Sequence, residues 1–242
     1  MSIPLTRSRY KGEFVVKDIT NNRQYLADLL FSWDVGDNLS AWSLAGNTLP
    51  TVASNGWMDF YDNTAGRGYS AARTTSIRAG QGEMPIALSC KIRRMPDDSS
   101  TDGMKFCAGL TGYDVVWGSF NIGFSIRDIQ NLQITYQAIP WVGSVDRFRY
   151  NFPVPADGTE HIVQLFRDTE KIGVIFDGVL LSPPSFILNV ETGNSAMSYT
   201  PHHYYCLSYK YPYFWCRHNA GEVTHFQVRD IKFGRLVGVG DV

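Results

Sequence analysis

The sequence predicts an all-β protein, and three observations support this fold class. First, two runs rich in β-branched and aromatic residues, 162–166 and 172–176, are joined by a short charged tip. Second, the pair Asp177-Gly178 follows them, and this pair favours a tight turn that reverses the chain again. Third, several other segments alternate apolar and polar residues, which is the period of a strand with one buried face.

Residues 157–181 should therefore form a three-strand meander. Both of its long runs are apolar at nearly every position. A strand of this kind is expected to have both faces covered. We therefore place the meander in the middle of a sheet, as the segment on which the other strands assemble.

The meander also resembles the signature of laminin-G-like and pentraxin-like domains, which reads G-x-W-H, strand, R-D, strand, Y-x-D-G. The matching residues are Gly158-Thr159-Glu160-His161, Arg167-Asp168 and Phe176-Asp177-Gly178. Glu160 stands where the family usually has Trp, and Phe176 where Tyr is common. These families belong to the concanavalin-A-like lectins and glucanases, so the resemblance implies a jelly-roll sandwich of two antiparallel sheets. It indicates architecture more than ligand.

Composition limits the classes of partner. The chain has 242 residues, of which 44% are apolar and 14% aromatic, enough for one large sandwich. Its net charge of −1 provides no basic field for nucleic acid. The sequence has no run of about 18 apolar residues, so no membrane insertion is expected. The start of the chain lacks a signal-peptide pattern, which predicts synthesis in the cytoplasm and four cysteines that stay reduced.

The first 33 residues differ from the rest and are predicted to form an N-terminal arm. Residues 13–19 favour a strand. Asn21-Asn22 then offers a helix N-cap, and a helical apolar stripe follows it: Tyr25, Leu26, Leu29, Leu30 and Trp33. This stripe must pack on the sandwich or on a neighbouring protein. We expect the arm (1–33) and a short tail (237–242) to contact other chains of a larger assembly, with the sandwich spanning 34–236.

Further strands are predicted along the sandwich, at 42–44, 57–60, 86–93, 104–110, 120–127, 132–137, 185–190 and 223–233. The apolar phase of the last strand shifts between Val228 and Ile231, which predicts a β-bulge. Residues 66–73 carry glycine on both sides of Arg67, and we interpret them as an edge or bulge segment. The loop 96–103 holds three carboxylates. Calcium is possible there, but a solvated hairpin tip is favoured because the EF-hand spacing is absent.

The most unusual segment is 199–218, which is rich in tyrosine and histidine. One hypothesis is a carbohydrate-binding platform, because flat rings with polar rims suit the apolar faces of sugars. Its candidate residues are Tyr204, Tyr209, Tyr211, Tyr213 and Trp215, together with Trp141. A second hypothesis is zinc bound by His203, Cys206, Cys216 and His218. A third is a strand pair in the core or at a subunit interface. Whether Cys206 and Cys216 are paired or ligate metal stays open.

Catalysis is not predicted. The glucanases that resemble this fold carry E-x-D-x-x-E, which places two carboxylates on one strand face. This sequence has no such stretch, no Gly-x-Ser-x-Gly and no His-Glu-x-x-His. We therefore expect a non-catalytic binding or structural protein without a required cofactor, as a virion component (phage capsid, fibre or tail) that displays a glycan-binding module. The alternatives are a stand-alone carbohydrate-binding module and, disfavoured, a polysaccharide hydrolase.

Overall fold

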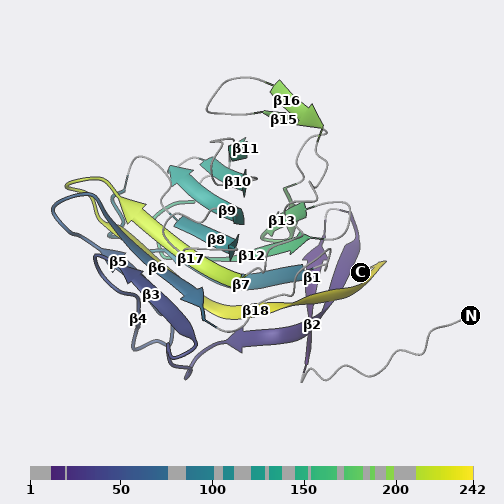
Figure 1. Ribbon diagram of the computed structural model, residues 1–242, viewed down its shortest axis with the longest axis horizontal. Coiled ribbons are helices and arrows are strands. Elements are labelled where there is room, and N and C mark those ends of the chain that lie inside the picture. Colours follow the sequence, from purple (N-terminus) through teal and green to yellow (C-terminus); the bar gives the residue numbers. More distant parts are fainter. Residues whose placement is uncertain are drawn as a thin grey trace, which may run out of the picture.

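The computed structural model is a sandwich of two antiparallel β-sheets (Figure 1). The structure describes residues 12–241 except for 20, 76–85, 101–105, 112–120, 129–130, 138–144, 152–153, 168–171, 182–185, 189–194 and 199–210. Within these residues no helix is long and apolar enough to cross a membrane.

The nine-stranded sheet has the order β1-β2-β18-β7-β12-β13-β14, with β5 beside β18 and β4 beside β5. Its strands are β1 (Glu13–Asp18), β2 (Arg23–Trp33), β4 (Thr51–Val52), β5 (Met58–Asp62), β7 (Ile86–Arg94), β12 (Glu160–Arg167), β13 (Ile172–Phe176), β14 (Val179–Leu180) and β18 (Thr224–Asp241). The meander β12-β13-β14 is present as predicted. Its predicted place in the middle of the sheet is wrong, because the three strands form one end of the sheet and only β12 pairs with a strand outside the meander, β7.

The seven-stranded sheet has the order β11-β10-β9-β8-β17-β6-β3. Its strands are β3 (Trp42–Gly46), β6 (Gly68–Thr74), β8 (Phe106–Thr111), β9 (Asn121–Asp128), β10 (Asn131–Gln137), β11 (Val145–Asn151) and β17 (Tyr211–His218). A separate pair is formed by β15 (Phe186–Leu188) and β16 (Ser195–Ser198). In Figure 1, β17 runs beside β6, in agreement with their pairing.

The main core lies between the two sheets and is built from alternate residues of each strand. The central strands contribute Ile86, Leu88, Cys90 and Ile92 from β7, Phe226, Val228, Ile231 and Phe233 from β18, and Phe214 and Cys216 from β17. Each of these side chains is almost fully buried. Burial of one such apolar side chain contributes about 1.5–3 kcal/mol to the free energy of unfolding. The burial of this layer is therefore the main source of the stability of the sandwich.

The bulge predicted in the last strand is confirmed. The pairing of β18 with β7 shifts register between Arg229 and Lys232, and Asp230 has a φ of 55°. Val228 and Ile231 are both fully buried although they lie three positions apart in the sequence. One inserted residue allows both side chains to face the core, because it restores the alternation on the far side of the bulge.

A second, smaller core covers the opposite face of the nine-stranded sheet at one end. There the β1–β2 hairpin packs over β7, β12 and β13, and the buried residues are Phe14, Val16, Tyr25, Ala27, Ala87, Phe166, Ile175 and Leu236. The rings of Tyr25 and Phe166 stack with centroids 4.0 Å apart. Phe166 and its neighbour Leu165 thus face two different cores. The prediction that both faces of the meander are covered is therefore confirmed at Leu165 and Phe166, but it is wrong for Ile162, which is 42% exposed.

The helix predicted after Asn22 is wrong, because residues 23–33 form strand β2. Asp18 accepts hydrogen bonds from Asn21, and Asn22 has a φ of 52°, so this segment is a turn between two strands. The apolar spacing that suggested a helix arises from a register shift. β18 pairs with Leu29 and with Phe31 but skips Leu30. The resulting bend lets the first half of β2 face the small core and the second half the main core.

The hairpin approaches β18 closely at Gly234. A methyl group built on Gly234 would lie 2.1 Å from the carbonyl oxygen of Asp28, which no real side chain tolerates. Only glycine fits there. Residues 13–33, predicted as an arm, thus pair within the sheet, and the contacts of residues 1–33 and 237–242 with other chains stay predictions.

The residues that resemble the laminin-G signature act structurally. Nδ1 of His161 lies 2.7 Å from Oδ2 of Asp177, and the other oxygen of Asp177 accepts a hydrogen bond from the amide of Ile162. The His161 ring stacks on Phe176 with centroids 4.9 Å apart. Asp177 and Gly178 both have positive φ angles, 49° and 82°. The signature therefore fastens the start of β12 to the β13–β14 turn.

Candidate functional site

Strand β17 places the predicted aromatic residues on two different faces of the seven-stranded sheet. Phe214 and Cys216 point into the main core. Tyr213 and Trp215 belong to neither core cluster, since they alternate with the core residues and face the other side. Tyr211 occupies the same alternate series of positions. Tyr204, Tyr209 and Trp141 lie outside the described residues.

Trp215 is the residue on this face whose side chain is best suited to contact a ligand. Its side chain is half-buried, and its indole Nε1 is buried without a hydrogen-bond partner. The guanidinium carbon of Arg217 lies 5.4 Å from the centre of the ring, within cation–π range. Tyr213, in contrast, is 4% exposed, so its ring offers little free surface. The face therefore centres on the indole and the neighbouring guanidinium.

The register places small residues beside this indole. Trp215 pairs with Ala71 of β6 on one side and with Cys107 of β8 on the other. In the next row Tyr213 pairs with Gly109, which in turn pairs with Gly123 of β9. Glycine carries no side chain, so these two paired positions add no side chain next to the aromatic strand. The indole of Trp215 beside such a row suits a flat, partly apolar ring.

The outer face of the nine-stranded sheet is a second polar region, but its charges are already paired. Trp57 is 2% exposed and lies between two guanidinium groups, Arg93 at 4.2 Å and Arg229 at 4.5 Å from the ring centre. Glu160 bridges Lys91 at 3.0 Å and Arg229 at 3.1 Å. This network stabilises the sheet surface, and both carboxylate oxygens of Glu160 take part in it.

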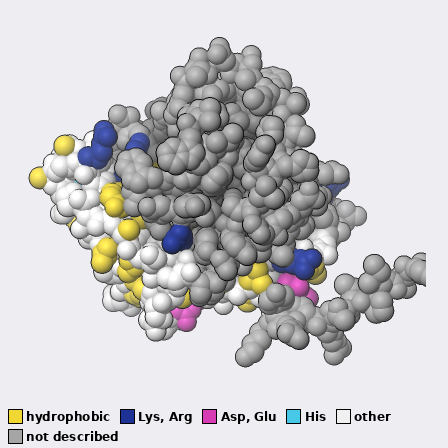
Figure 2. All heavy atoms as spheres, in the orientation of Figure 1, with side chains coloured by type: hydrophobic (Ala, Val, Ile, Leu, Met, Phe, Trp, Pro, Cys, Tyr) yellow, Lys and Arg dark blue, Asp and Glu magenta, His cyan; other side chains and the backbone are white. Residues whose placement is uncertain are grey.

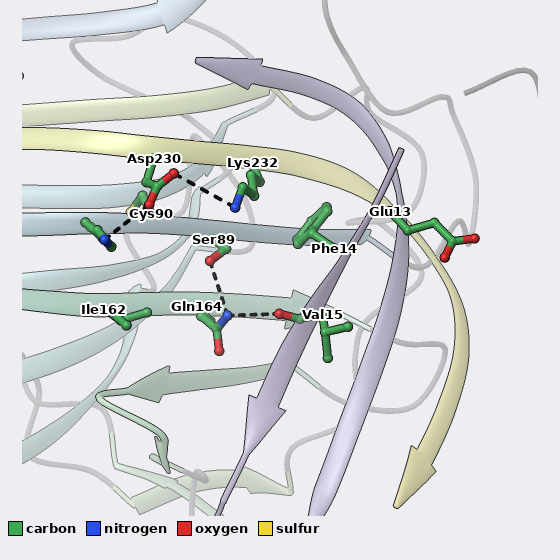
Figure 3. Close-up of a pocket in the computed structure, with 10 residues that line it drawn as sticks. Glu13, Phe14, Val15, Ser89, Cys90, Ile162, Gln164, Asp230 and Lys232 are labelled. Carbon is green, nitrogen blue, oxygen red and sulfur yellow. Dashed lines mark hydrogen bonds and ion pairs between the residues drawn. The ribbon is translucent and has the colours of Figure 1, made fainter. Parts of the chain in front are cut away.

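A cavity of about 290 Å³ lies on the same side, under β1 (Figure 3). Gln164 spans it: its amide nitrogen donates to the carbonyl of Val15 and to Oγ of Ser89, both at 3.2 Å. Its amide oxygen accepts from the backbone of Lys17 at 3.1 Å. Figure 3 shows Gln164 pointing toward β1 between these partners. Gln164 therefore fixes the hairpin over the sheet, and the cavity is the gap that this bridge leaves.

The acidic loop favoured as a solvated hairpin tip is largely occupied by protein partners. Asp98 is 6% exposed and accepts hydrogen bonds from Arg94 at 2.7 Å and from Ser100 at 2.9 Å. Asp97 lies 2.5 Å from Nδ1 of His225. The interpretation as a solvated tip is wrong for Asp98, which is part of a buried ion pair. Within the described residues no group of three or more His, Cys, Asp and Glu side chains could hold a metal ion.

His225 links this loop to β5. Its two ring nitrogens lie 2.5 Å from a carboxylate oxygen of Asp97 and 2.9 Å from one of Asp59. Burial lowers the pKa of His225, but the hydrogen bonds and charges of the two aspartates outweigh burial and raise this pKa above its ordinary value. The imidazolium therefore holds three segments together.

The described thiols are structural. Cys90 and Cys216 are free and buried, and burial raises the pKa of both thiols well above its ordinary value. Cys216 and His218 occupy the core-facing side of β17, so both are out of solvent. The other two residues of the zinc hypothesis, His203 and Cys206, lie outside the described residues.

Solved structures that resemble this chain share its fold. A lectin, UEA-II, complexed with galactose matches with a TM-score of 0.56 and 13% identity, over 87% of this chain and 100% of the other. A seed lectin from Lotus tetragonolobus matches with a TM-score of 0.56 and 10% identity, over 88% and 98%. An alginate lyase of polysaccharide lyase family 7 matches with a TM-score of 0.52 and 10% identity, over 77% and 83%.

No protein-family model and no curated protein matches the sequence. At identities this low, the structural matches show the fold alone. The chain therefore has the concanavalin-A-like lectin fold that the resemblance in β12–β14 implied.

Proposed function

We propose that this protein is a non-catalytic carbohydrate-binding protein, and that the glycan lies on the face of the seven-stranded sheet around Trp215. The observation that carries the proposal is the state of this indole. It is half-buried outside both cores, and its Nε1 donor has no partner although it is buried. A sugar hydroxyl can accept that hydrogen bond while the C–H face of the sugar packs on the ring.

The neighbouring residues fit the same ligand. The guanidinium of Arg217 lies next to the ring, and Gly109 and Gly123 in the neighbouring row carry no side chains. The lectin fold of the chain supports the proposal as an analogy, since a sandwich of this type can carry several functions.

Hydrolysis of a polysaccharide is the alternative function, and the alginate lyase among the structural matches shares only the fold. Acid–base catalysis on a glycoside needs two carboxylates about 5–10 Å apart. The residues that pair with Tyr213 and Trp215 are Arg73, Ala71, Gly109 and Cys107, none of which is acidic. Binding without turnover is therefore the function that this face supports.

A glycan array tests the proposal. Wild-type protein should bind a defined set of glycans, and Trp215→Ala should weaken binding at least about tenfold, equivalent to about 1.4 kcal/mol. The matched control is Ile162→Ala, because Ile162 is 42% exposed on the other sheet. Both variants should keep the wild-type circular dichroism spectrum. No binding by the wild type, or equal binding by Trp215→Ala, would contradict the proposal.

A further inference from the structure

The rows of paired residues around Trp215 contain arginine and no acidic residue. The row of Trp215 crosses the seven strands of its sheet and consists of Ala45, Ala71, Trp215, Cys107, Ser125, Gln133 and Arg149. The next row consists of Ser43, Arg73, Tyr213, Gly109, Gly123, Thr135 and Arg147. Among the residues that the structure pairs in these two rows, three are arginines and none is Asp or Glu.

Two arginines flank the indole of Trp215. Arg217 lies two positions along β17 from Trp215, so the two side chains share a face of the sheet. Arg73 of β6 pairs with Tyr213, which makes it the diagonal neighbour of Trp215 on that face, on the opposite side from Arg217. The side chains of both arginines are half-buried. A ligand stacked on the indole therefore has a guanidinium on either side of it along the strand.

The outer face of the nine-stranded sheet shows that this charge pattern is local. There Lys91 lies 3.0 Å from Glu160 and 3.3 Å from Asp230, and Arg229 lies 3.1 Å from Glu160. Cations on that face are thus interleaved with carboxylates. The whole chain has a net charge of −1, so the arginines around Trp215 do not reflect a generally basic protein. Their position on the face of the indole is what bears on the ligand.

We propose that the glycan bound at Trp215 is an acidic polysaccharide whose sugar rings carry carboxylate groups, that is, a uronate. This inference rests on the proposed function, since it names the ligand class of the same face. A guanidinium offers a planar fork of donors that matches a carboxylate with two hydrogen bonds. Two positions along a strand span about 6.7 Å. One sugar can therefore stack on the indole while a carboxylate at the edge of its ring reaches Arg217 or Arg73.

Nucleic acid is another polyanion that arginine attracts, but it suits this face less well. Proteins that bind single strands combine a positively charged groove with several aromatic rings on which successive bases stack. Tyr213, the ring nearest to Trp215 on this side of β17, is 4% exposed and adds no free stacking surface. An acidic polysaccharide needs only one stacked sugar and the guanidinium groups beside it.

The test uses the full-length protein and pairs of polymers that differ in charge. Polymannuronate, polygalacturonate and polyglucuronate are each compared with the same polymer after its carboxylates have been reduced to alcohols. We expect at least one uronate to bind at least about tenfold more tightly than its reduced form in calorimetric titrations, equivalent to about 1.4 kcal/mol. This advantage should shrink between about 50 mM and about 500 mM NaCl, because salt screens the charges. These measurements need no variant.

Arginine variants locate the charge that the carboxylate meets. Arg217→Gln and Arg73→Gln each remove a charge and keep a polar side chain. Each should weaken binding of the uronate by about tenfold, or about 1.4 kcal/mol, and leave binding of the reduced polymer unchanged. Arg235→Gln is the matched control, because Arg235 is exposed on β18 of the other sheet and should bind the uronate as wild type does. All three variants should keep the wild-type circular dichroism spectrum.

The outcomes separate this inference from the proposed function. Equal binding of each uronate and its reduced form, or binding of neutral glycans alone, would overturn the inference and leave glycan binding intact if Trp215→Ala abolishes it. Tighter binding of dextran sulfate or of single-stranded DNA than of every uronate would overturn the assignment of a carboxylate ligand. Wild-type binding of the uronate by both Arg217→Gln and Arg73→Gln would do the same. Absence of binding to any glycan would overturn the proposed function as well.

Discussion

Replacement of Phe166 by alanine should show whether the β1–β2 hairpin is an integral part of the sandwich. Phe166 is 0% exposed in the small core and stacks on Tyr25 of the hairpin at 4.0 Å. Truncation of a fully buried phenylalanine to alanine costs about 3–5 kcal/mol. The lost aromatic pair adds about 0.5–1.5 kcal/mol beyond the buried area. We therefore expect Phe166→Ala to lose about 4 kcal/mol of unfolding free energy.

Urea denaturation followed by tryptophan fluorescence and by circular dichroism measures this loss. The matched control is Ile162→Ala on the same strand, which is 42% exposed and should cost less than about 1 kcal/mol. The two probes should give coincident transitions, because the hairpin shares β18 and β12 with the main core. A loss below about 1 kcal/mol in Phe166→Ala, or a separate early transition of the hairpin, would refute the reasoning.

Three further predictions follow from buried or charged groups. Asp98→Asn leaves the buried guanidinium of Arg94 without its carboxylate, and should cost about 3–5 kcal/mol in urea denaturation. The raised pKa of His225 stabilises the fold fully below about pH 6.5, and this contribution should fall as pH rises through the folded-state pKa, so wild type should lose more stability than His225→Phe from pH 6 to 8. Cys90 and Cys216 should resist thiol reagents at pH 8 until urea unfolds the chain, as peptide mass mapping would show.

Each of these predictions has a contrary outcome. Asp97→Asn is the control for Asp98→Asn, since the Asp97 side chain is 57% exposed, and equal losses in both would argue against the buried pair. Parallel pH curves for wild type and the His225 variant would contradict the raised pKa. Rapid labelling of Cys216 in native protein would show that the end of the sandwich opens to solvent.

The sequence was sufficient to predict the meander, but not its place at one end of the sheet, which depends on distant strands. The reason is local: two wholly apolar runs and the Asp177-Gly178 turn specify hairpins without distant contacts. The bulge near Asp230 was also predictable, because the alternation of apolar and polar residues in this one strand shifts by one position at the bulge.

The prediction of a helix in residues 23–33 was wrong because the apolar spacing of this segment depends on distant partners. β2 pairs with β1 and with β18. Leu30 has no partner in β18, and the resulting shift gives the apolar residues a spacing that resembles helical periodicity. The same limit applies to the buried pair of Asp62 and His218, which lie far apart in the sequence. Only His218 was a candidate ligand, in the zinc hypothesis. No local sequence pattern indicates that Asp62 is its neighbour in the fold.

The predicted platform stays a prediction. Trp215 and Tyr213 alternate with the core residues of β17, and Tyr213 is largely covered. Tyr204, Tyr209 and Trp141 lie outside the described residues, as does much of the surface in Figure 2, where the described hydrophobic side chains are scattered over the part formed by β3 to β6. The virion setting also stays a prediction.

The most direct test of glycan binding at Trp215 is hydrogen–deuterium exchange with and without the strongest glycan from the array. We predict slower exchange in β17, β6 and β8, the three strands that surround Trp215, with no shortening of the glycan during the experiment. Protection confined to the outer face of the nine-stranded sheet around Trp57, or cleavage of the glycan, would contradict the account.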